Sequence, residues 1–432
     1  MARQPDVAVP VTATVAVVGG GWAGCAAAFT LAEAGVAVDL FEAGRTLGGR
    51  ARGVLLDGHA LDNGQHILLG AYTHCLDLIR RAGSDDGGDL WRLPLTIETP
   101  PDFHLACPRL PAPLHLIAGL AGAHGLDWRD KWQAARWVQR NLWGPEPATD
   151  RTVAELTFDQ PDAVKRLLWH PLCVSALNTP PRQASARAFL AVLRAAFGAR
   201  RADSDLLLPR RDLTLLFPSR AAERVLLHGG AVRLTCRIER IEAANGTFRL
   251  HAGEGVRHYS HVVVAVAPQH LAALTADLPG LESARNAIAD YRYLPIATGY
   301  VQYASDFRLN APLYALEDGP AQFVFDRGQS HGQPGTMAFV ASAATRLPAD
   351  WLDQAEAQLR RFAAPGAARW RRRIVEKQAT YACEPGLARP PVRTAHPRLF
   401  LAGDYTDGPY PATLESAASS GVQSALALLD SL

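Results

Sequence analysis

The sequence predicts an α/β protein in which a Rossmann-like dinucleotide-binding domain is interleaved with an α+β substrate-binding domain. Three observations lead to this prediction. Residues 14–42 read as strand, glycine turn, helix and second strand. Residues 399–423 repeat a strand, a glycine turn and a small-residue helix near the other end of the chain. With 432 residues, the chain is also too long for one hydrophobic core, since single cores stop growing at about 250 to 300 residues.

The N-terminal glycine turn has the spacing and the context of a dinucleotide-binding fingerprint. The β-branched run TVAVV (residues 14–18) leads directly into GGGWAG, and a small-residue helix and the strand VAVDLFEA follow. In such a motif Gly19 permits the tight turn, Gly21 lets the backbone approach a pyrophosphate, and Gly24 lets the helix lie close to the sheet. The pyrophosphate then binds at the positive N-terminus of the helix.

Glu42 ends the second strand about 20 residues after the turn, where a carboxylate accepts hydrogen bonds from ribose hydroxyls. Its charge would repel the 2′-phosphate of NADP, so we expect an adenine dinucleotide without that phosphate. The candidate cofactor-binding residues of this region are Gly19, Gly21, Trp22, Ala23, Gly24, Glu42 and Ala43.

The next segment, GRTLGGRARG (residues 44–53), distinguishes FAD from NAD. Its Gly48-Gly49-Arg50 turn resembles the second glycine signature of FAD enzymes related to amine oxidases and carotene desaturases. The resemblance implies FAD as the cofactor and a glutathione-reductase-type FAD-binding domain of the amine oxidase subgroup. Gly49 would keep the backbone close to the flavin, and Arg50 would neutralise phosphate charge.

The C-terminal motif LFLAGDYTDGPYPATLESAASSGVQ resembles the last flavin-binding segment of the same enzymes. The resemblance implies that Asp404 binds the ribityl and phosphate portion of FAD. It also implies a helix that begins at residues 412–414, has Pro411 in its first turn, and stabilises negative charge at the flavin N1 and C2 carbonyl. In relatives the strand residue at Ile238 contacts adenine through its backbone. The implied contacts are Ile238, Gly403, Asp404, Ala412, Thr413 and Leu414.

The FAD-binding domain is expected to be discontinuous. HGGAVRLTCRIERIEAANGTFRL (residues 228–250) is predicted to form a hairpin-like pair of strands, and SHVVVAVAP (residues 260–268) another buried strand. Three pieces of chain would build the FAD-binding domain, and the two pieces between them would build the substrate-binding domain. These pieces are residues 1–85, 205–270 and 390–432 for the former, and residues 86–204 and 271–389 for the latter.

Two internal stretches narrow the resemblance. HPLCVSALNTPP (residues 170–181) and LLLPRRDLTLLFP (residues 206–218) are similar to segments of hydroxysqualene dehydroxylases, the squalene-associated FAD enzymes of bacterial hopanoid synthesis. The resemblance covers nearly the whole chain. It implies an oxidoreductase acting on CH or CH2 groups, in which reduced FAD removes the hydroxyl group of hydroxysqualene and squalene is the product. A hydroxysqualene synthase would hand over the substrate. Because the hydroxyl is allylic, protonation and loss of water leave a delocalised cation that accepts hydride from the flavin N5.

The stretch LDNGQHILLG (residues 61–70) sets polar groups and a glycine beside aliphatic residues. Gly64, Gln65 and His66 match positions that line the flavin ring in related amine oxidases. His66 is the first candidate for the proton donor, because a histidine with a near-neutral pKa can donate a proton at cytoplasmic pH. Gln65 could orient water or the leaving hydroxyl. The alternative is a structural histidine that bonds to backbone or flavin.

His170 and Asn178 are second candidates, on the opposite wall of the substrate cavity. His-Pro and Asn-Thr-Pro sequences are also typical of turns and helix boundaries. Related amine oxidases carry a lysine near the flavin N5, in a strand that corresponds to YLPIATGYVQY (residues 293–303), and this chain has no lysine there. Amine oxidation is therefore disfavoured.

Residues 110–143 predict contact with a membrane surface. Trp128, Trp132, Trp137 and Trp143 alternate with arginine and lysine in the second half of this segment, which is typical of amphipathic helices in the membrane interface. An ordinary surface helix is the alternative. The chain has no run of 18 apolar residues that could cross a bilayer. We therefore expect a cytoplasmic protein that is peripheral on the inner face of the cytoplasmic membrane.

Composition argues against several other classes of protein. The formal net charge is +2 and no long basic block occurs, so nucleic acid is not an expected partner. The six cysteines are scattered without a C-x-x-C pair, which argues against a zinc site and a disulfide framework; no metal ligand is assigned. Residues 1–21 lack the pattern of a signal peptide. The run Arg371–Arg373 is interpreted as a solvated helix face.

Two other functions stay open. A carotene desaturase or isomerase of the same fold would act on a similarly apolar substrate, with the flavin running in the oxidising direction. A non-catalytic prenyl-lipid binding protein, like the Rab escort and dissociation-inhibitor proteins, would work without FAD. The intact glycine turn, Glu42, Arg50 and Asp404 argue against this last function.

Overall fold

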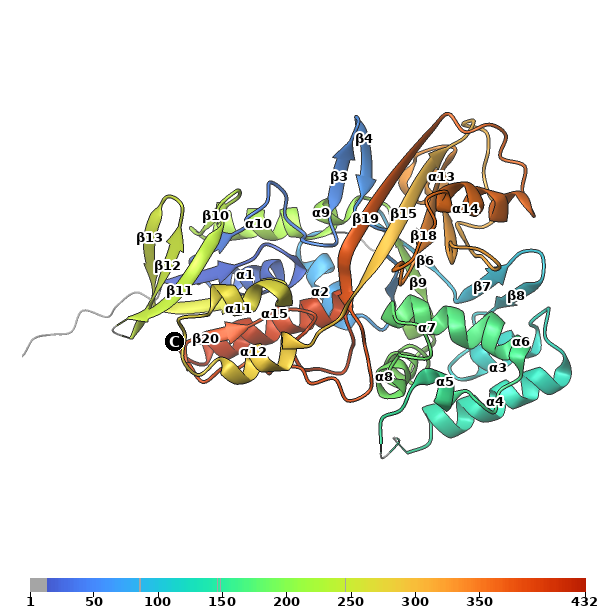
Figure 1. Ribbon diagram of the computed structural model, residues 1–432, viewed down its shortest axis with the longest axis horizontal. Helices are drawn as coiled ribbons and strands as arrows, with labels where there is room; N and C mark the ends of the chain where they lie inside the picture. Colours follow the sequence, from blue (N-terminus) through green and yellow to red (C-terminus); the bar gives the residue numbers. More distant parts are fainter. Residues whose placement is uncertain (1–13, 85–86, 146, 148, 245) are drawn as a thin grey trace, which may run out of the picture.

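The N-terminal glycine turn lies at the end of the central strand of a parallel five-stranded sheet (Figure 1). β1 (Val15–Val18) pairs with β2 (Val38–Phe41) on one side and with β14 (His261–Val264) on the other. β10 (Ala231–Arg233) and β20 (Leu399–Leu401) form the two edges. The three inner strands are almost wholly buried, as expected for a parallel sheet that is covered on both faces.

The computed structural model describes residues 14–84, 87–145, 147, 149–244 and 246–432. Most of the N-terminal segment on which the signal-peptide prediction rests lies outside these ranges.

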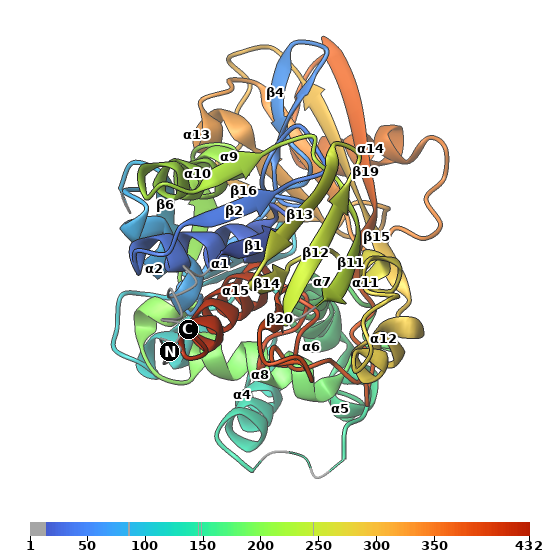
Figure 2. The ribbon, with the colours of Figure 1, turned by 90° about the vertical axis from the view of Figure 1, so that its left-hand side faces the viewer.

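Alternate residues of β1 face two different hydrophobic clusters, because successive side chains of a strand point to opposite faces. Val15 and Val17 face a layer of helices, and Ala16 and Val18 face a small antiparallel sheet. Figure 2 shows this small sheet alongside β1 and β14. The helices are α1 (Trp22–Glu33), α2 (Thr73–Arg81), α9 (Leu213–Leu216), α10 (Pro218–Leu227) and α15 (Leu414–Leu429), and the strands are β11 (Ile238–Ala244), β12 (Thr247–Ala252) and β13 (Gly255–Tyr259).

The predicted hairpin over residues 228–250 is therefore only partly correct. β11 and β12 form an antiparallel pair, but β10, which precedes them, joins the parallel sheet beside β2. Next to the small sheet lie α11 (Pro268–Leu274) and α12 (Glu282–Ala289). The edge strand β10 of the parallel sheet thus comes from a segment whose alternating apolar and polar residues predict a hairpin strand.

A second five-stranded sheet is antiparallel and has the order β16-β17-β18-β15-β19. One face is covered by α14 (Trp351–Arg360), where a Cβ on Gly299 would lie 2.4 Å from the Leu352 side chain. The opposite face packs on residues of the 61–70 segment and its neighbours. The strands are β15 (Tyr293–Gln302), β16 (Leu313–Ala315), β17 (Phe323–Asp326), β18 (Thr336–Ala341) and β19 (Trp370–Tyr381), and α13 (Arg327–His331) follows β17.

The interpretation of Arg371–Arg373 as a helix face is wrong, because these residues lie in β19. Their side chains alternate between the two faces of the strand. Arg371 pairs with Glu356 of α14, and Arg372 pairs with Asp57 at 2.6 Å, in the turn between β3 and β4. These residues adopt a strand conformation because β19 pairs with β15. A run of like charges does not distinguish a strand from a helix.

Short strands connect the two large sheets. The hairpin of β3 (Gly53–Leu56) and β4 (His59–Asp62) lies beside β19 in Figure 1, and His59 stacks on Trp370 with ring centroids 4.2 Å apart. The remaining strands form a three-stranded and a two-stranded sheet. These strands are β5 (Leu68–Leu69), β6 (Leu90–Leu93) and β9 (Leu206–Pro209) in the first, and β7 (Thr96–Thr99) and β8 (Phe103–Ala106) in the second.

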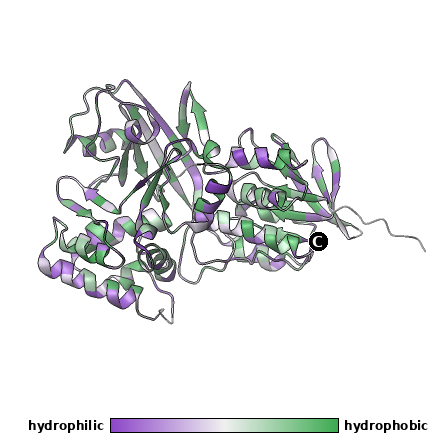
Figure 3. Cartoon of the chain, turned by 180° about the vertical axis from the view of Figure 1, so that it is seen from behind, coloured by the Kyte–Doolittle hydropathy of each residue, from purple (hydrophilic) through white to green (hydrophobic). Residues whose placement is uncertain are grey.

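A helical region lies between residues 114 and 204. Trp137 is buried in this region, packs against Trp169 with ring centroids 4.3 Å apart, and donates to Leu156 O at 3.1 Å. Figure 3 shows hydrophilic and hydrophobic residues on the same helices of this region. The elements are α3 (Leu114–Ala121), α4 (Trp128–Leu142), α5 (Val153–Leu156), α6 (Asp162–Val164), a π-helical turn (Lys165–Trp169), α7 (His170–Leu177), α8 (Ala186–Phe197) and a 3-10 turn (Arg201–Ser204).

Candidate active site

Gly19 and Gly24 form a turn that is too tight for side chains. Gly19 has a φ of +112°, and a Cβ there would lie 2.4 Å from the main-chain oxygen of Ala265, just after β14. A Cβ on Gly24 would lie 1.8 Å from Gly19 O. The start of α1 is therefore held directly against the end of β1, which is the geometry that a dinucleotide-binding turn requires.

Gly21 faces the second glycine turn across a space without side chains. Gly48 N donates to Gly20 O at 2.8 Å, and a Cβ on Gly49 would lie 3.1 Å from Gly21 Cα. Within the described chain, only Gly49 Cα lies within 4 Å of a Cβ built on Gly21. Because Gly21 is also the N-cap of α1, the free N–H groups of the first helical turn lie next to this space. A pyrophosphate suits such a position.

Glu42 is held at the end of β2 by two main-chain donors. Its carboxylate accepts from Gly20 N at 2.8 Å and from Gly44 N at 2.6 Å. The chain that leads into β11 meets the same point, because Cys236 N donates to Glu42 O at 2.9 Å. Ile238 follows two residues later and is buried. The residues predicted to contact the adenosine half of FAD thus lie close together.

Trp22 and Ala23 lie inside the helix layer, whereas Ala43 is exposed beside Glu42. Trp22 Nε1 donates to Ala51 O at 3.1 Å. A Cβ on Gly421 would lie 2.2 Å from Ala23 O, so α1 and α15 are in close backbone contact. Both buried residues therefore position the first turn of α1.

Arg50 links the glycine turns to the C-terminal motif. Its Nη2 lies 2.5 Å from Asp404 Oδ1, and its Nη1 donates to Ala379 O at 2.7 Å. Burial alone would lower the pKa of Arg50, but Asp404, supported by Glu376, raises that pKa above its ordinary value. Arg50 therefore remains a cation and can neutralise an anion nearby. Gly403, which precedes the aspartate, has a φ of +157°.

The C-terminal helix begins later than predicted. α15 starts at Leu414, and the Thr413 hydroxyl caps it by accepting from Ser416 N at 3.1 Å. Ala412 and Pro411 therefore lie before the helix, and Pro411 is not in its first turn. A threonine at the N-cap satisfies a main-chain donor that a proline cannot, which explains the shift.

The polar part of the 61–70 segment is tied to both large sheets. Asn63 Nδ2 donates to Arg50 O at 3.0 Å and to Glu376 Oε2, on β19, at 2.9 Å. Asp62 accepts from Arg327 Nη1 at 2.9 Å, and both side chains are buried. This segment is consequently held between the candidate cofactor-binding residue Arg50 and the antiparallel sheet.

Gln65 and His66 are both engaged by neighbouring groups. Gln65 Nε2 donates to Tyr300 Oη at 3.0 Å, and Tyr300 Oη donates to Asp62 O at 2.7 Å. His66 Nδ1 lies 3.0 Å from Gly64 O, which only a protonated Nδ1 can bond. Burial lowers the pKa of His66 below its ordinary value of 6.5, in spite of that bond. The ring is therefore neutral at neutral pH, with Nε2 unprotonated.

His170 and Asn178 are not joined to this group. His170 is exposed at the start of α7. Asn178, the left-handed C-cap of α7, donates to Leu294 O at 3.3 Å and to Thr380 Oγ1 at 3.0 Å, and it accepts from Ala343 N at 2.7 Å. The hydrogen-bonding groups of Asn178 therefore hold the helix end, which favours its structural interpretation.

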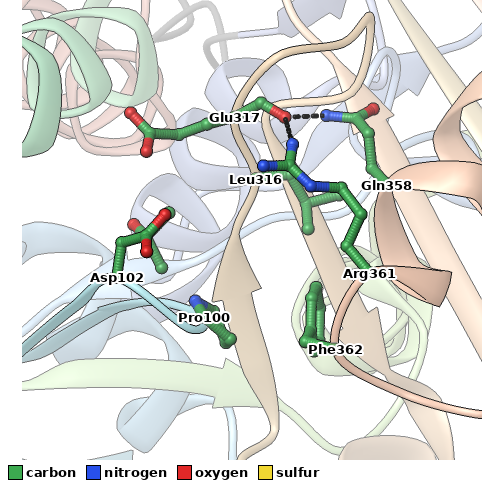
Figure 4. Close-up of a pocket in the computed structure, with 8 residues that line it drawn as sticks. Pro100, Asp102, Leu316, Glu317, Gln358, Arg361 and Phe362 are labelled. Carbon is green, nitrogen blue, oxygen red and sulfur yellow. Dashed lines mark hydrogen bonds between the residues drawn. The ribbon is translucent and has the colours of Figure 1, made fainter.

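The crevice in Figure 4 contains none of the predicted site residues. Glu317 O accepts there from Gln358 Nε2 at 2.9 Å and from Arg361 Nη1 at 3.4 Å. These bonds join α14 to the loop that follows β16, and the loop between β7 and β8 lines the other side of the crevice.

Three of the four tryptophans in the predicted interfacial segment are exposed. Trp128 and Trp132 lie one helical turn apart on α4, with 72% and 61% of their surfaces exposed, and Trp143 is half exposed. Trp137 is buried, so its assignment to the membrane face is wrong; in an amphipathic helix it belongs to the core side. We call Trp128, Trp132 and Trp143 the tryptophan face.

The chain belongs to the flavin-containing amine oxidoreductase family, whose family model matches residues 22–429. FAD is accordingly its cofactor. The predicted fold class and the predicted cofactor are thus confirmed.

More specific similarity comes from two relatives named hydroxysqualene dehydroxylase. The protein of Rhodopseudomonas palustris is 27% identical and that of Sinorhizobium fredii 25% identical, each over 95% of this chain and 97% of the relative. The solved structure of putrescine oxidase with putrescine bound is 18% identical, has a TM-score of 0.74 and covers 97% of this chain and 99% of its own. At that identity, this last likeness shows the fold alone.

Sequence reasoning missed several polar residues of this site. Glu376 and Tyr300 both come from the antiparallel sheet, and Arg327 comes from α13. Asp62 lies in the 61–70 segment, but its partner Arg327 is 265 positions away in the sequence. No local signal identifies such residues, because only the pairing of distant strands brings them to the site.

Proposed function

We propose that this protein is an FAD-dependent oxidoreductase that removes the hydroxyl group of hydroxysqualene and forms squalene. The observation that carries the proposal is the full-length similarity, at 25–27% identity, to two proteins named for this reaction. The chemistry of the candidate site supports the same substrate.

An apolar wall lies beside the flavin-lining candidates. The face of the antiparallel sheet that packs on the 61–70 segment is built of aliphatic and aromatic side chains, many of them only half buried. A long isoprenoid chain needs such walls, with few polar groups to fix its orientation. The half-buried residues of this face include Ile296, Phe323 and Ile374, and Ile67, Trp91 and Leu93 of neighbouring segments belong to the same cluster.

The residues around the glycine turns fit FAD. The space between Gly21 and Gly49 admits a pyrophosphate at the N-terminus of α1, and Glu42 would accept hydrogen bonds from the ribose. Arg50 and Asp404 would hold the phosphate and ribityl portion, with Gly64 beside the ring. When bound in its reduced form, FAD supplies the hydride that replaces the hydroxyl group.

His66 and Gln65 are proposed to act on the leaving oxygen. The reaction exchanges a C–O bond for a C–H bond and releases water, so it needs one proton at that oxygen. His66 would donate this proton from Nε2, since Nδ1 is bonded to Gly64 O, and Gln65 would orient the hydroxyl. Because the pKa of His66 is lowered, the donating form is a minor one at neutral pH.

We further propose that the tryptophan face contacts an anionic membrane surface from the cytoplasmic side. Arg129 Cζ lies over the Trp128 ring, 5.6 Å from its centroid, and Arg136 is exposed on the same helix. Exposed tryptophans beside basic residues are typical of interfacial helices. None of the described helices is long and apolar enough to cross a membrane. An apolar substrate, handed over by a hydroxysqualene synthase, would reach the enzyme from this surface.

The decisive experiment is anaerobic incubation of the chemically reduced, FAD-loaded protein with hydroxysqualene. We expect squalene as the product. A conjugated polyene under oxidising conditions, without squalene, would instead support the carotene desaturase or isomerase alternative. Purified protein without flavin absorbance that still bound prenyl lipid would support the non-catalytic alternative.

A further inference from the structure

The hydroxyl group of Thr298 is buried and has no partner in the described chain. Thr298 lies in the middle of β15 and is fully inaccessible to solvent. Its Oγ1 makes no hydrogen bond within the part of the protein that the structure describes. Buried hydroxyls are nearly always hydrogen-bonded, so an orphan of this kind requires an explanation.

The surroundings of this hydroxyl on the sheet are apolar. In the adjacent strands Thr298 lies opposite Val340 and Ile374, and Ile296 and Tyr300 occupy the same face of β15. Tyr300 is already bonded to Asp62 and Gln65. A valine would therefore pack here as well as threonine does, and it would avoid burying an unpaired polar group. Sheet packing alone does not account for the hydroxyl.

The same hydroxyl faces the flavin-lining candidates. A Cβ built on Gly64 would lie 3.9 Å from Thr298 Oγ1 and 3.8 Å from His66 Cε1. The threonine hydroxyl and the imidazole ring therefore both lie within 4 Å of the position that a side chain on Gly64 would occupy. His66 belongs to the 61–70 segment, and Thr298 to the sheet that carries the apolar wall.

We propose that Thr298 Oγ1 hydrogen-bonds the hydroxyl oxygen of the isoprenoid substrate and so holds the C–O bond next to His66. This inference rests on the proposed function and specifies which residue recognises the oxygen. A threonine hydroxyl can both donate and accept, so it can bond the alcohol before the reaction and the released water after it. In an apolar cavity, a single polar contact of this kind fixes the position of a long chain that otherwise slides.

The test compares Thr298→Val with a matched control, Thr275→Val. Thr275 is equally buried, but its hydroxyl donates to Leu271 O at 2.7 Å. In Thr298→Val we expect an unchanged or raised Tm and a fall in kcat/KM for hydroxysqualene of about 10- to 100-fold. In Thr275→Val we expect a lower Tm and an unchanged kcat/KM. Thr298→Ser, which keeps the hydroxyl, should recover most of the lost activity.

Two further readouts separate the outcomes. The FAD affinity and the reduction potential of the bound flavin should be the same in Thr298→Val and wild type; a shift in either would show that Thr298 bonds the flavin and would overturn the proposal. Wild-type kcat/KM in Thr298→Val, or a Tm loss equal to that of the control, would overturn it too. Wild-type protein that forms no squalene would overturn the proposed function itself, and with it the substrate assigned to Thr298.

Discussion

Arg50 and Asp404 are separated by 354 positions in the sequence, yet their side chains form an ion pair with Nη2 and Oδ1 2.5 Å apart. The arginine side chain is 30% exposed and the aspartate side chain 7%. Through Asn63, which bonds Arg50 O, the same pair reaches the 61–70 segment. One ion pair thus connects the three parts of the chain that are proposed to surround FAD.

Replacing Asp404 should weaken both the fold and cofactor binding. Asp404→Ala leaves a partly buried guanidinium without its carboxylate partner, so we expect a loss of about 1–3 kcal/mol in the free energy of unfolding. Urea unfolding measures this loss, and flavin absorbance after gel filtration measures the retained FAD. Arg393→Ala is the control, because its pair with Asp430 is exposed on both sides and should contribute within about 0.5 kcal/mol. Equal losses in the two variants would contradict the role given to the Arg50–Asp404 pair.

Gly21→Ala should strongly weaken FAD binding without unfolding the protein. The new Cβ would meet only Gly49 Cα, at 3.9 Å, and would occupy the space assigned to the pyrophosphate. The FAD content should fall at least about tenfold, while the unfolding free energy of the FAD-free protein should stay within about 0.5 kcal/mol. Gly253→Ala is a suitable control, since a Cβ there contacts nothing within 4 Å in the described chain. Full flavin content in Gly21→Ala would refute the pyrophosphate assignment.

The activity of the enzyme should rise as the pH falls below 6.5. A proton donor must be protonated, and burial lowers the pKa of His66 below its ordinary value of 6.5. More of the enzyme therefore carries the proton as the pH approaches this lower pKa. The pH dependence of kcat/KM measures this rise in activity at low pH, which should disappear in His66→Gln. If kcat/KM of His66→Gln still rises at low pH, another group is the proton donor.

The same lowered pKa has a consequence for stability. A group whose pKa is lower in the folded than in the unfolded state stabilises the fold above its unfolded pKa, and this contribution is lost as the pH falls. The difference in unfolding free energy between wild type and His66→Gln should therefore decrease below pH 6.5. Urea unfolding at pH 5 and pH 8 tests this; a difference that grows at low pH would contradict the burial of a neutral ring.

Local motifs allowed the cofactor side of this molecule to be predicted from sequence. Gly19, Gly24 and Glu42 stand within one strand-helix-strand unit, so their spacing alone specifies their arrangement. Pro411 lies outside α15, although proline is common in the first turn of helices, because the hydroxyl of Thr413 caps the helix two residues later.

The substrate side was less predictable for a different physical reason. The strand Trp370–Tyr381 owes its conformation to pairing with β15, and its charged run has the same appearance on a helix or a strand. Thr298 looks like any β-branched strand residue until the fold brings Gly64 next to it. Contacts between strands that are far apart in the sequence leave no local sequence pattern. Residues that act through such contacts therefore cannot be predicted from the sequence.

Loss of the tryptophan face should detach the protein from anionic membranes. Trp128→Ala with Trp132→Ala removes two exposed rings from one side of α4, and each ring that enters the interface contributes apolar burial. We expect partitioning to vesicles that contain phosphatidylglycerol to fall at least about tenfold in sedimentation assays. High salt should weaken the binding of the wild type, because Arg129 and Arg136 would face anionic lipid.

Leu227→Ala is the matched control for this experiment. Leu227 is 79% exposed but lies on α10, beside the parallel sheet and away from the helical region that carries the tryptophans. Its removal should leave vesicle binding unchanged, and both variants should keep wild-type FAD content. Equal vesicle binding by the double variant and the wild type would show that the tryptophan face is an ordinary exposed helix surface. Loss of binding together with unchanged turnover of detergent-solubilised substrate would instead separate membrane delivery from catalysis, because the two rings lie outside the candidate active site.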